Sequence, residues 1–311
     1  MVLEFLAGLW IQKNGNSLDQ TRSIVVPHAR LGWKHDTGLE KKFLGENFTT
    51  DENGFRKTTS TPGKRVLFLG PSSTVGWGVS DEKSYPSVVG KSFEVTNASQ
   101  IGYSTHQGLN LFRSDFAGKK FDVTIISYGI NDVDFHRFYW QSTLTDANEL
   151  TLPRSEFVTS LQKWIYKSST IMVLQKIVFT GLTKLTGMKN SGPDEKQIRV
   201  SETEFRKNLL DLIQDVKKSG SLPVLLLTAT HFKRHEDEKI DLIQNILIKR
   251  MNQFEQVMME VARDEKVLLA DPDVWLKGPR DELFVDPVHF SEKGNQQIGK
   301  GLITLIRDGQ R

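Results

Sequence analysis

Arg65-Val66-Leu67-Phe68-Leu69-Gly70 is the segment that gives the clearest indication of the fold class. A short apolar run that ends in glycine is typical of a strand buried on both faces of a parallel sheet. Helical patterns separate such runs, the clearest at residues 237–264, where apolar residues recur at spacings of three and four. Strands that alternate with helices predict an α/β fold, a parallel sheet covered on both faces. Four more runs complete the predicted sheet, at residues 93–97, 123–128, 223–227 and 267–270.

The alternation of strands and helices defines two parts of the chain. Residues 1–61 have no such pattern and predict an N-terminal extension that is largely extended and irregular. Pro62-Gly63 then marks the beginning of a domain at 62–311, which contains all five predicted strands. One long interruption, at about 134–199, lacks a good strand and predicts a helical insertion.

The bulk composition excludes several classes of protein. The chain has 311 residues, a formal net charge of +3 and no cysteine, so it has no disulfide or zinc–thiolate site and no indication of a nucleic-acid partner. No apolar run reaches the ~18 residues of a membrane span, and the apolar start lacks the basic region of a signal peptide. We expect a cytoplasmic protein if the chain is complete, and an exported or anchored one if an upstream segment is missing. The composition indicates no oligomeric state.

The segment 161–186 within the insertion is both apolar and basic. The simpler interpretation is a helix packed over the edge of the sheet. Contact with a membrane surface is the alternative, because lysines beside an apolar stripe suit an anionic bilayer.

Candidate site residues lie just after the predicted strands. Ser72 comes two residues after Gly70, at the edge of a parallel sheet where ligands bind. Near the end of the chain, Asp286 precedes His289 by three residues, so the carboxylate can hold one ring nitrogen and leave the other free to take a proton. By itself Ser72 is better explained as a helix N-cap, but a serine, an acid and a histidine together indicate acyl transfer.

Two further residues complete this set of groups. Gly102 follows the second predicted strand and could present a backbone N–H, and Asn131 follows the third and could present a side-chain amide. The structural alternatives are a turn glycine and an Asx turn. Such chemistry needs neither a metal nor a cofactor. Three more side chains are candidates for substrate contact, namely Trp77, Tyr103 and His231.

Residues 62–311 resemble the SGNH or GDSL-like hydrolases. The similarity is carried by four blocks in the expected order, at residues 66–79, 97–108, 129–132 and 286–289. It implies a flavodoxin-like three-layer α/β/α fold and a serine esterase that hydrolyses a carboxylic O-acyl ester of a small molecule or glycan. It also implies the roles of five residues: Ser72 as nucleophile, Asp286 and His289 as acid and base, and the Ser72 N–H, Gly102 and Asn131 as the oxyanion hole.

Pro71 departs from the pattern of this family, which usually has an aspartate before the nucleophile. Proline removes a carboxylate and a backbone N–H, although its φ suits the start of a helix. A catalytically silent binding module on the same site is therefore one alternative to an esterase. A second alternative, which does not depend on Pro71, is an O-acyltransferase that gives the acyl group to a carbohydrate instead of water. Ser73 is a rival nucleophile.

Overall fold

The core of the molecule is a five-stranded parallel sheet. The computed structural model describes residues 6, 17–134, 145–150, 155–171, 173–174, 198–233 and 238–308. The sheet has the order β6-β5-β7-β8-β9, which is 2-1-3-4-5 among its strands in chain order and matches the flavodoxin-like arrangement. The predicted fold is therefore confirmed. The strands are β5 (Arg65–Leu69), β6 (Glu94–Asn97), β7 (Val123–Ile126), β8 (Leu222–Leu226) and β9 (Leu268–Ala270).

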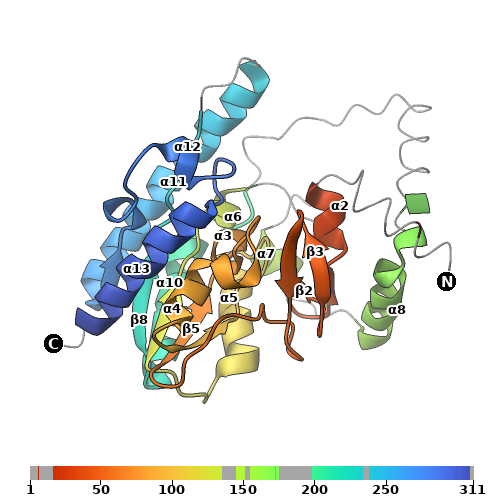
Figure 1. The fold of residues 1–311 in the computed structure, drawn as a ribbon, viewed down its shortest axis with the longest axis horizontal. Coiled ribbons are helices and arrows are strands. Elements are labelled where there is room, and N and C mark those ends of the chain that lie inside the picture. Colours follow the sequence, from red (N-terminus) through yellow and green to blue (C-terminus); the bar gives the residue numbers. More distant parts are fainter. Residues whose placement is uncertain are drawn as a thin grey trace.

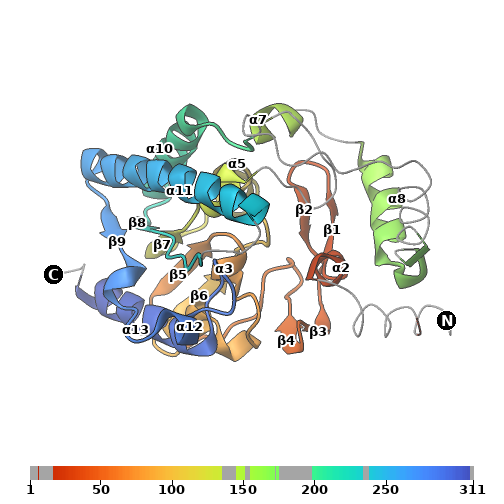
Figure 2. The same ribbon diagram turned by 90° about the horizontal axis from the view of Figure 1, so that it is seen from above.

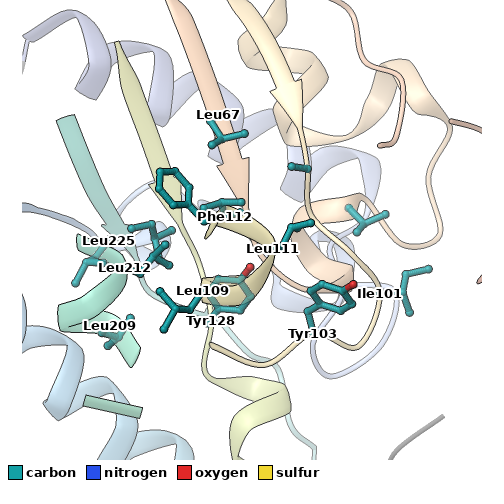
Figure 3. Close-up of a cluster of buried hydrophobic side chains, with 14 of the residues drawn as sticks. Leu67, Ile101, Tyr103, Leu109, Leu111, Phe112, Tyr128, Leu209, Leu212 and Leu225 are labelled. Carbon is teal, nitrogen blue, oxygen red and sulfur yellow. The ribbon is translucent and has the colours of Figure 1, made fainter. Parts of the chain in front are cut away.

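Helices cover both faces of this sheet (Figures 1 and 2). Alternate residues of β5 point to opposite faces, so Leu67 and Leu69 join one hydrophobic cluster while Val66 and Phe68 join another. The first cluster includes side chains of α5 (Thr105–Leu111), α10 (Glu202–Lys218) and α11 (Glu238–Glu265). The second includes side chains of α4 (Tyr85–Gly90) and α13 (Glu292–Asp308). Figure 3 shows part of the first cluster, including Leu67, Leu109, Leu209, Leu212 and Leu225.

Shorter helical segments connect these elements. Most of them lie in the loops that lead into or out of the long helices. They are α3 (Ser72–Val75), η1 (Asp81–Lys83), η2 (Phe112–Phe116), α6 (Ile130–Val133), η3 (Pro272–Val274) and α12 (Arg280–Leu283).

The segment before the core is more regular than its sequence predicts. Its described part forms a helix and two antiparallel hairpins instead of irregular chain, namely α2 (Ser17–Arg22), β1 (Val25–His28) with β2 (Gly32–His35), and β3 (Glu40–Phe43) with β4 (Glu46–Thr49). The segment is attached to the edge of the main sheet, because Arg56 forms an antiparallel bridge with Asn97 of β6. Trp33 and Phe48 lie in the same hydrophobic cluster as Leu67. The division of the chain at residue 61 stays a prediction.

The described part of the predicted insertion includes the helices α7 (Asp146–Glu149) and α8 (Glu156–Lys167), and residues 169–171 and 173–174 are also helical. α8 packs against β1 at the side of the molecule (Figures 1 and 2). It leaves Phe157 and Trp164 largely exposed, at 77% and 68%. The part of the 161–186 segment after Leu174 lies outside the described residues. Within the described ranges, no helix has the length and apolar content that a membrane span requires.

The contact between α4 and α13 gives a test of the packing. Gly299 of α13 faces Val88 of α4 so closely that an added Cβ would lie 2.5 Å from the Val88 Cβ. We expect Gly299→Ala to lower the free energy of unfolding by up to ~2 kcal/mol, because overpacking costs about 1–3 kcal/mol and helix propensity returns only about 1 kcal/mol. Urea unfolding measures the difference. The exposed neighbour Lys300→Ala is the control, with an expected change within about 0.5 kcal/mol. A Gly299→Ala protein as stable as the control would contradict the packing.

Candidate active site

Ser72 is the first residue of α3, directly beyond the carboxyl end of β5. The turn before it requires glycine, since a Cβ at Gly70 would lie 2.1 Å from Thr74 Oγ1 and 2.9 Å from the Ser127 carbonyl oxygen. Pro71 occupies the N-cap, and its carbonyl oxygen accepts from the backbone N–H of Thr74 at 3.0 Å and of Val75 at 2.9 Å. The proline thus starts the helix without a side-chain cap, and the turn after β5 still closes.

Ser72, His289 and Asp286 form a continuous chain of hydrogen bonds. Ser72 Oγ lies 2.7 Å from His289 Nε2, and His289 Nδ1 lies 2.7 Å from Asp286 Oδ2. The Ser72 residue is 8% exposed and His289 is 9% exposed, so the hydroxyl–imidazole contact is almost removed from water. The structure brings together the three residues that the sequence predicted as nucleophile, base and acid.

The Asp286 carboxylate is held by several donors. Its Oδ1 accepts from the backbone N–H of Val288 at 3.0 Å and of His289 at 2.9 Å, while Oδ2 faces the imidazole. Partial burial alone would raise the pKa of Asp286, but the hydrogen bonds from the His289 ring and from the two backbone N–H groups outweigh burial and hold the pKa below its ordinary value. The carboxylate therefore stays ionised at neutral pH and orients the ring.

Two of the residues predicted as oxyanion donors, Gly102 and Asn131, meet at the loop after β6. Gly102 has a φ of +76°, a conformation that favours glycine, and its carbonyl oxygen accepts from Arg199 Nη1 at 2.8 Å. Asn131 Nδ2 donates to the carbonyl oxygen of Tyr103, the next residue, at 3.1 Å. An amide carries two N–H groups, so the second donor of Asn131 is not used by this bond.

Asp132 and Arg199 are buried beside this loop and were missed as site residues in the sequence. Asp132 Oδ1 accepts from the backbone N–H of Thr105 at 2.8 Å and Oδ2 accepts from the N–H of Gly129 at 3.1 Å. Burial raises the pKa of Asp132 to about 7, although the hydrogen bonds from Thr105 act against it. The position of Asp132 in the 129–132 block, directly after Asn131, is the signal in the sequence that could have identified it.

Arg199 gave no signal in the sequence because its partners are distant in the chain. It is 2% exposed and pairs with Asp146, with Nη2 and Oδ2 2.8 Å apart. Its Nη2 also donates to Gln107 Oε1 at 2.7 Å. Burial alone would lower the pKa of Arg199, but the Asp146 carboxylate raises it above the ordinary value. The guanidinium is therefore charged, and it links the predicted insertion to the loop that carries Gly102.

The three residues expected to contact substrate lie in different surroundings. Trp77 stacks on the imidazole of His289, with ring centroids 4.8 Å apart. His231 Nε2 lies 2.7 Å from Asp281 Oδ1, and its backbone N–H donates to the carbonyl oxygen of Pro287, beside Asp286. Tyr103 is 0% exposed and its hydroxyl donates to the Trp33 carbonyl oxygen at 2.5 Å. The expectation for Tyr103 is thus corrected, because a fully buried ring cannot meet a substrate in this structure.

The sequence matches a known family over most of its length. The profile of the GDSL-like lipase/acylhydrolase family covers residues 68–297, which include Ser72, Gly102, Asn131, Asp286 and His289. The chain belongs to the GDSL-like lipase/acylhydrolase family. Membership in this family makes the chain a hydrolase that acts on ester bonds.

Solved structures of GDSL-like and related esterases are similar at low sequence identity. A lipase/acylhydrolase from Enterococcus faecalis is 17% identical, with 80% of this chain and 97% of that chain covered and a TM-score of 0.49. An aryl esterase of M. smegmatis is 16% identical, with 79% and 99% covered and a TM-score of 0.48. A carbohydrate acetylesterase from Sinorhizobium meliloti is 12% identical, with 79% and 99% covered and a TM-score of 0.49. No curated protein matches the sequence.

The buried ion pair of this GDSL-like hydrolase gives a stability test. We expect Arg199→Met and Asp146→Leu each to lower the free energy of unfolding by about 3–5 kcal/mol, because each leaves a buried charge without its partner. The double variant removes both charges and should recover much of the loss. Urea unfolding of the four proteins measures the coupling.

An exposed ion pair provides the matched control. Lys207 and Asp211 lie 2.8 Å apart on α10, with the Lys207 side chain 70% exposed, and Lys207→Met should cost less than about 1 kcal/mol. Single variants of Arg199 and Asp146 that lose no more than this control would contradict a structural role for the buried pair.

Proposed function

We propose that the protein is a serine esterase that hydrolyses a carboxylic O-acyl ester through Ser72, His289 and Asp286. The observation that supports this most directly is the geometry of one imidazole ring. Its Nε2 lies 2.7 Å from the Ser72 hydroxyl and its Nδ1 lies 2.7 Å from Asp286. These distances suit transfer of the hydroxyl proton to the ring, which is the step that makes a serine nucleophilic.

The reaction follows from the roles of these groups. Ser72 Oγ bonds to the ester carbonyl carbon while its proton passes to His289 Nε2, and the Asp286 carboxylate stabilises the imidazolium that forms. The tetrahedral intermediate collapses, the C–O bond to the alcohol breaks, and the imidazolium gives its proton to the leaving alkoxide. A water molecule then gives a proton to His289 Nε2 while its oxygen attacks the carbonyl carbon of the acyl-enzyme. The bond to Ser72 Oγ breaks, the acid is released, and the proton passes from His289 to Ser72.

Three donors are assigned to the oxyanion of the intermediate. The backbone N–H of Ser72 stands at the first position of α3, where a helix has no internal acceptor for it. The Gly102 N–H and the second N–H of the Asn131 amide complete the set. Donors held in place before the reaction stabilise developing negative charge without reorganisation.

The GDSL-like esterase is favoured over a catalytically silent binding module by the turn at Pro71. The module was motivated by the loss of the aspartate that the family usually has at this position. Yet α3 begins at Ser72, and the hydroxyl keeps its 2.7 Å contact with His289. The missing carboxylate is not required for either of the two hydrogen bonds that the mechanism uses.

A fluorophosphonate probe tests the assignment of the nucleophile. We expect the probe to label Ser72, as determined by peptide mapping, because its hydroxyl lies 2.7 Å from the His289 imidazole, which can take the proton. Ser72→Ala should lose labelling and hydrolysis of an aryl acetate, whereas the matched control Ser73→Ala should keep most of both. Labelling of Ser73, or no labelling of the folded protein, would refute the proposal.

Substitution of Asn131 tests the oxyanion hole. We expect Asn131→Ala to lower kcat by about 10²–10³, the usual cost of one oxyanion donor, with a smaller effect on KM. The matched control is Asn110→Ala on α5, whose amide lies 3.0 Å from His106 Nε2 and has no assigned role in the reaction. Steady-state kinetics on an aryl acetate measure both. An unchanged kcat for Asn131→Ala would leave Asn131 with a structural role only.

A further inference from the structure

Trp77 covers one face of the imidazole ring that the proposed reaction uses as its base. The two rings are nearly parallel, with an interplanar angle of 14° and centroids 4.8 Å apart. The two ring nitrogens of the same imidazole are hydrogen-bonded, Nδ1 to Asp286 and Nε2 to Ser72. His289 is thus held by two edge contacts and one face contact, and its neighbour at the face is the most electron-rich ring among the side chains.

The indole is itself fixed from two sides. The backbone N–H of Trp77 donates to the Ser72 carbonyl oxygen at 3.1 Å, so the residue that covers the base is bonded to the residue that carries the nucleophile. On the other side, Phe43 of β3 meets the indole edge to face, with centroids 4.8 Å apart and an angle of 85°. Phe43 in turn packs against Phe48 of β4.

A buried arginine holds the loop that carries Trp77. Arg56 is 2% exposed, and its guanidinium donates to the carbonyl oxygens of Gly76 and of Val79, at 2.6 Å for the latter. These two residues flank Trp77 and Gly78 in the chain. The guanidinium also lies over the Phe48 ring at 4.6 Å. The β3–β4 hairpin and Arg56 therefore set the position of the indole before any substrate binds.

We propose that Trp77 is a positioning residue that stabilises the protonated form of His289 through a cation–π interaction. This inference rests on the proposed function, in which the ring is neutral before attack and becomes an imidazolium as the Ser72 proton arrives. The face of an indole attracts a cation more strongly than a neutral ring. The stack therefore stabilises the transition state more than the ground state, and such differential stabilisation raises kcat.

A positioning role for Trp77 and a substrate-binding role predict different kinetics for a variant that lacks the indole. Loss of the indole should lower kcat by about 3- to 30-fold, the rate equivalent of a cation–π interaction, and should leave KM nearly unchanged. The imidazolium also loses its partner, so the ring should release its proton at lower pH. The other groups around the ring stay in place, namely Asp286, Ser72 and the pair of His231 and Asp281 beside the Asp286 loop.

The experiment compares Trp77→Leu, Trp77→Phe and Phe43→Leu with the wild type, all in the full chain. Circular dichroism and thermal unfolding establish that each variant folds. Kinetics on an aryl acetate between pH 5 and 8 give kcat, KM and the acid limb of the profile. NMR titration of the ring protons of His289 gives the midpoint of its protonation without any substrate. Trp77→Phe retains an aromatic face, so it serves as the conservative rescue and as the second variant if leucine disrupts folding.

We expect the Trp77→Leu midpoint to lie about 0.4–1.5 pH units below that of the wild type, together with the loss of kcat. The midpoint of Trp77→Phe should lie between those of the wild type and Trp77→Leu. Phe43→Leu should shift the midpoint in the same direction by a smaller amount. A fall in kcat with an unmoved midpoint, a rise in KM alone, or an unchanged protein would each overturn the proposal. Because the NMR titration needs no turnover, it tests the stack even if the fluorophosphonate probe fails to label Ser72.

Discussion

The hydrogen bond between the Ser72 hydroxyl and the His289 imidazole joins residues 217 positions apart, and the site depends on it. One end is placed by the sheet, because β5 delivers Ser72 at its carboxyl edge. The other end is placed by the packing of α13 on α4. Asn295 of α13 accepts from the Tyr85 N–H at 3.0 Å and donates to the Phe290 carbonyl oxygen at 3.0 Å. The close packing of α13 on α4 at Gly299 therefore helps to set the position of His289.

The N-terminal segment supports the loops of the site from outside the region that defines the family. Trp33 Nε1 donates to the Ile101 carbonyl oxygen at 2.7 Å, and His35 Nε2 accepts from the Ile101 N–H at 3.2 Å. These bonds hold the residue before Gly102. Arg56 does the same for the loop after α3. The family match begins only at residue 68. Side chains that hold the loops of the site, such as Trp33, His35 and Arg56, therefore lie outside the segment by which the family is recognised.

Two buried guanidinium groups show how such loops are stabilised. Removing a charge from water is costly unless it is paired and fully hydrogen-bonded. Arg199 meets this condition with Asp146, Gln107 and the Gly102 carbonyl oxygen. Arg56 meets it with Asp81 and with backbone carbonyl oxygens. In both cases a planar group with several donors binds the irregular chain beside a candidate site residue, which an apolar side chain could not do.

Patterns in the amino-acid sequence predict the sheet, its helices and the candidate residues Ser72, Asp286 and His289. Buried parallel strands are continuous apolar runs, and Asp286 meets His289 three residues along the chain, so both signals are local. The packing of the elements, and no pattern in the sequence, buries Tyr103, pairs Arg199 with Asp146 and places Trp77 on the imidazole of His289. The hydrogen bond between Arg199 and Asp146 joins residues 53 positions apart, and the one from Tyr103 to Trp33 joins residues 70 positions apart. A contact across such a distance leaves no periodicity in the chain, because it is set by how the elements pack and not by their own pattern.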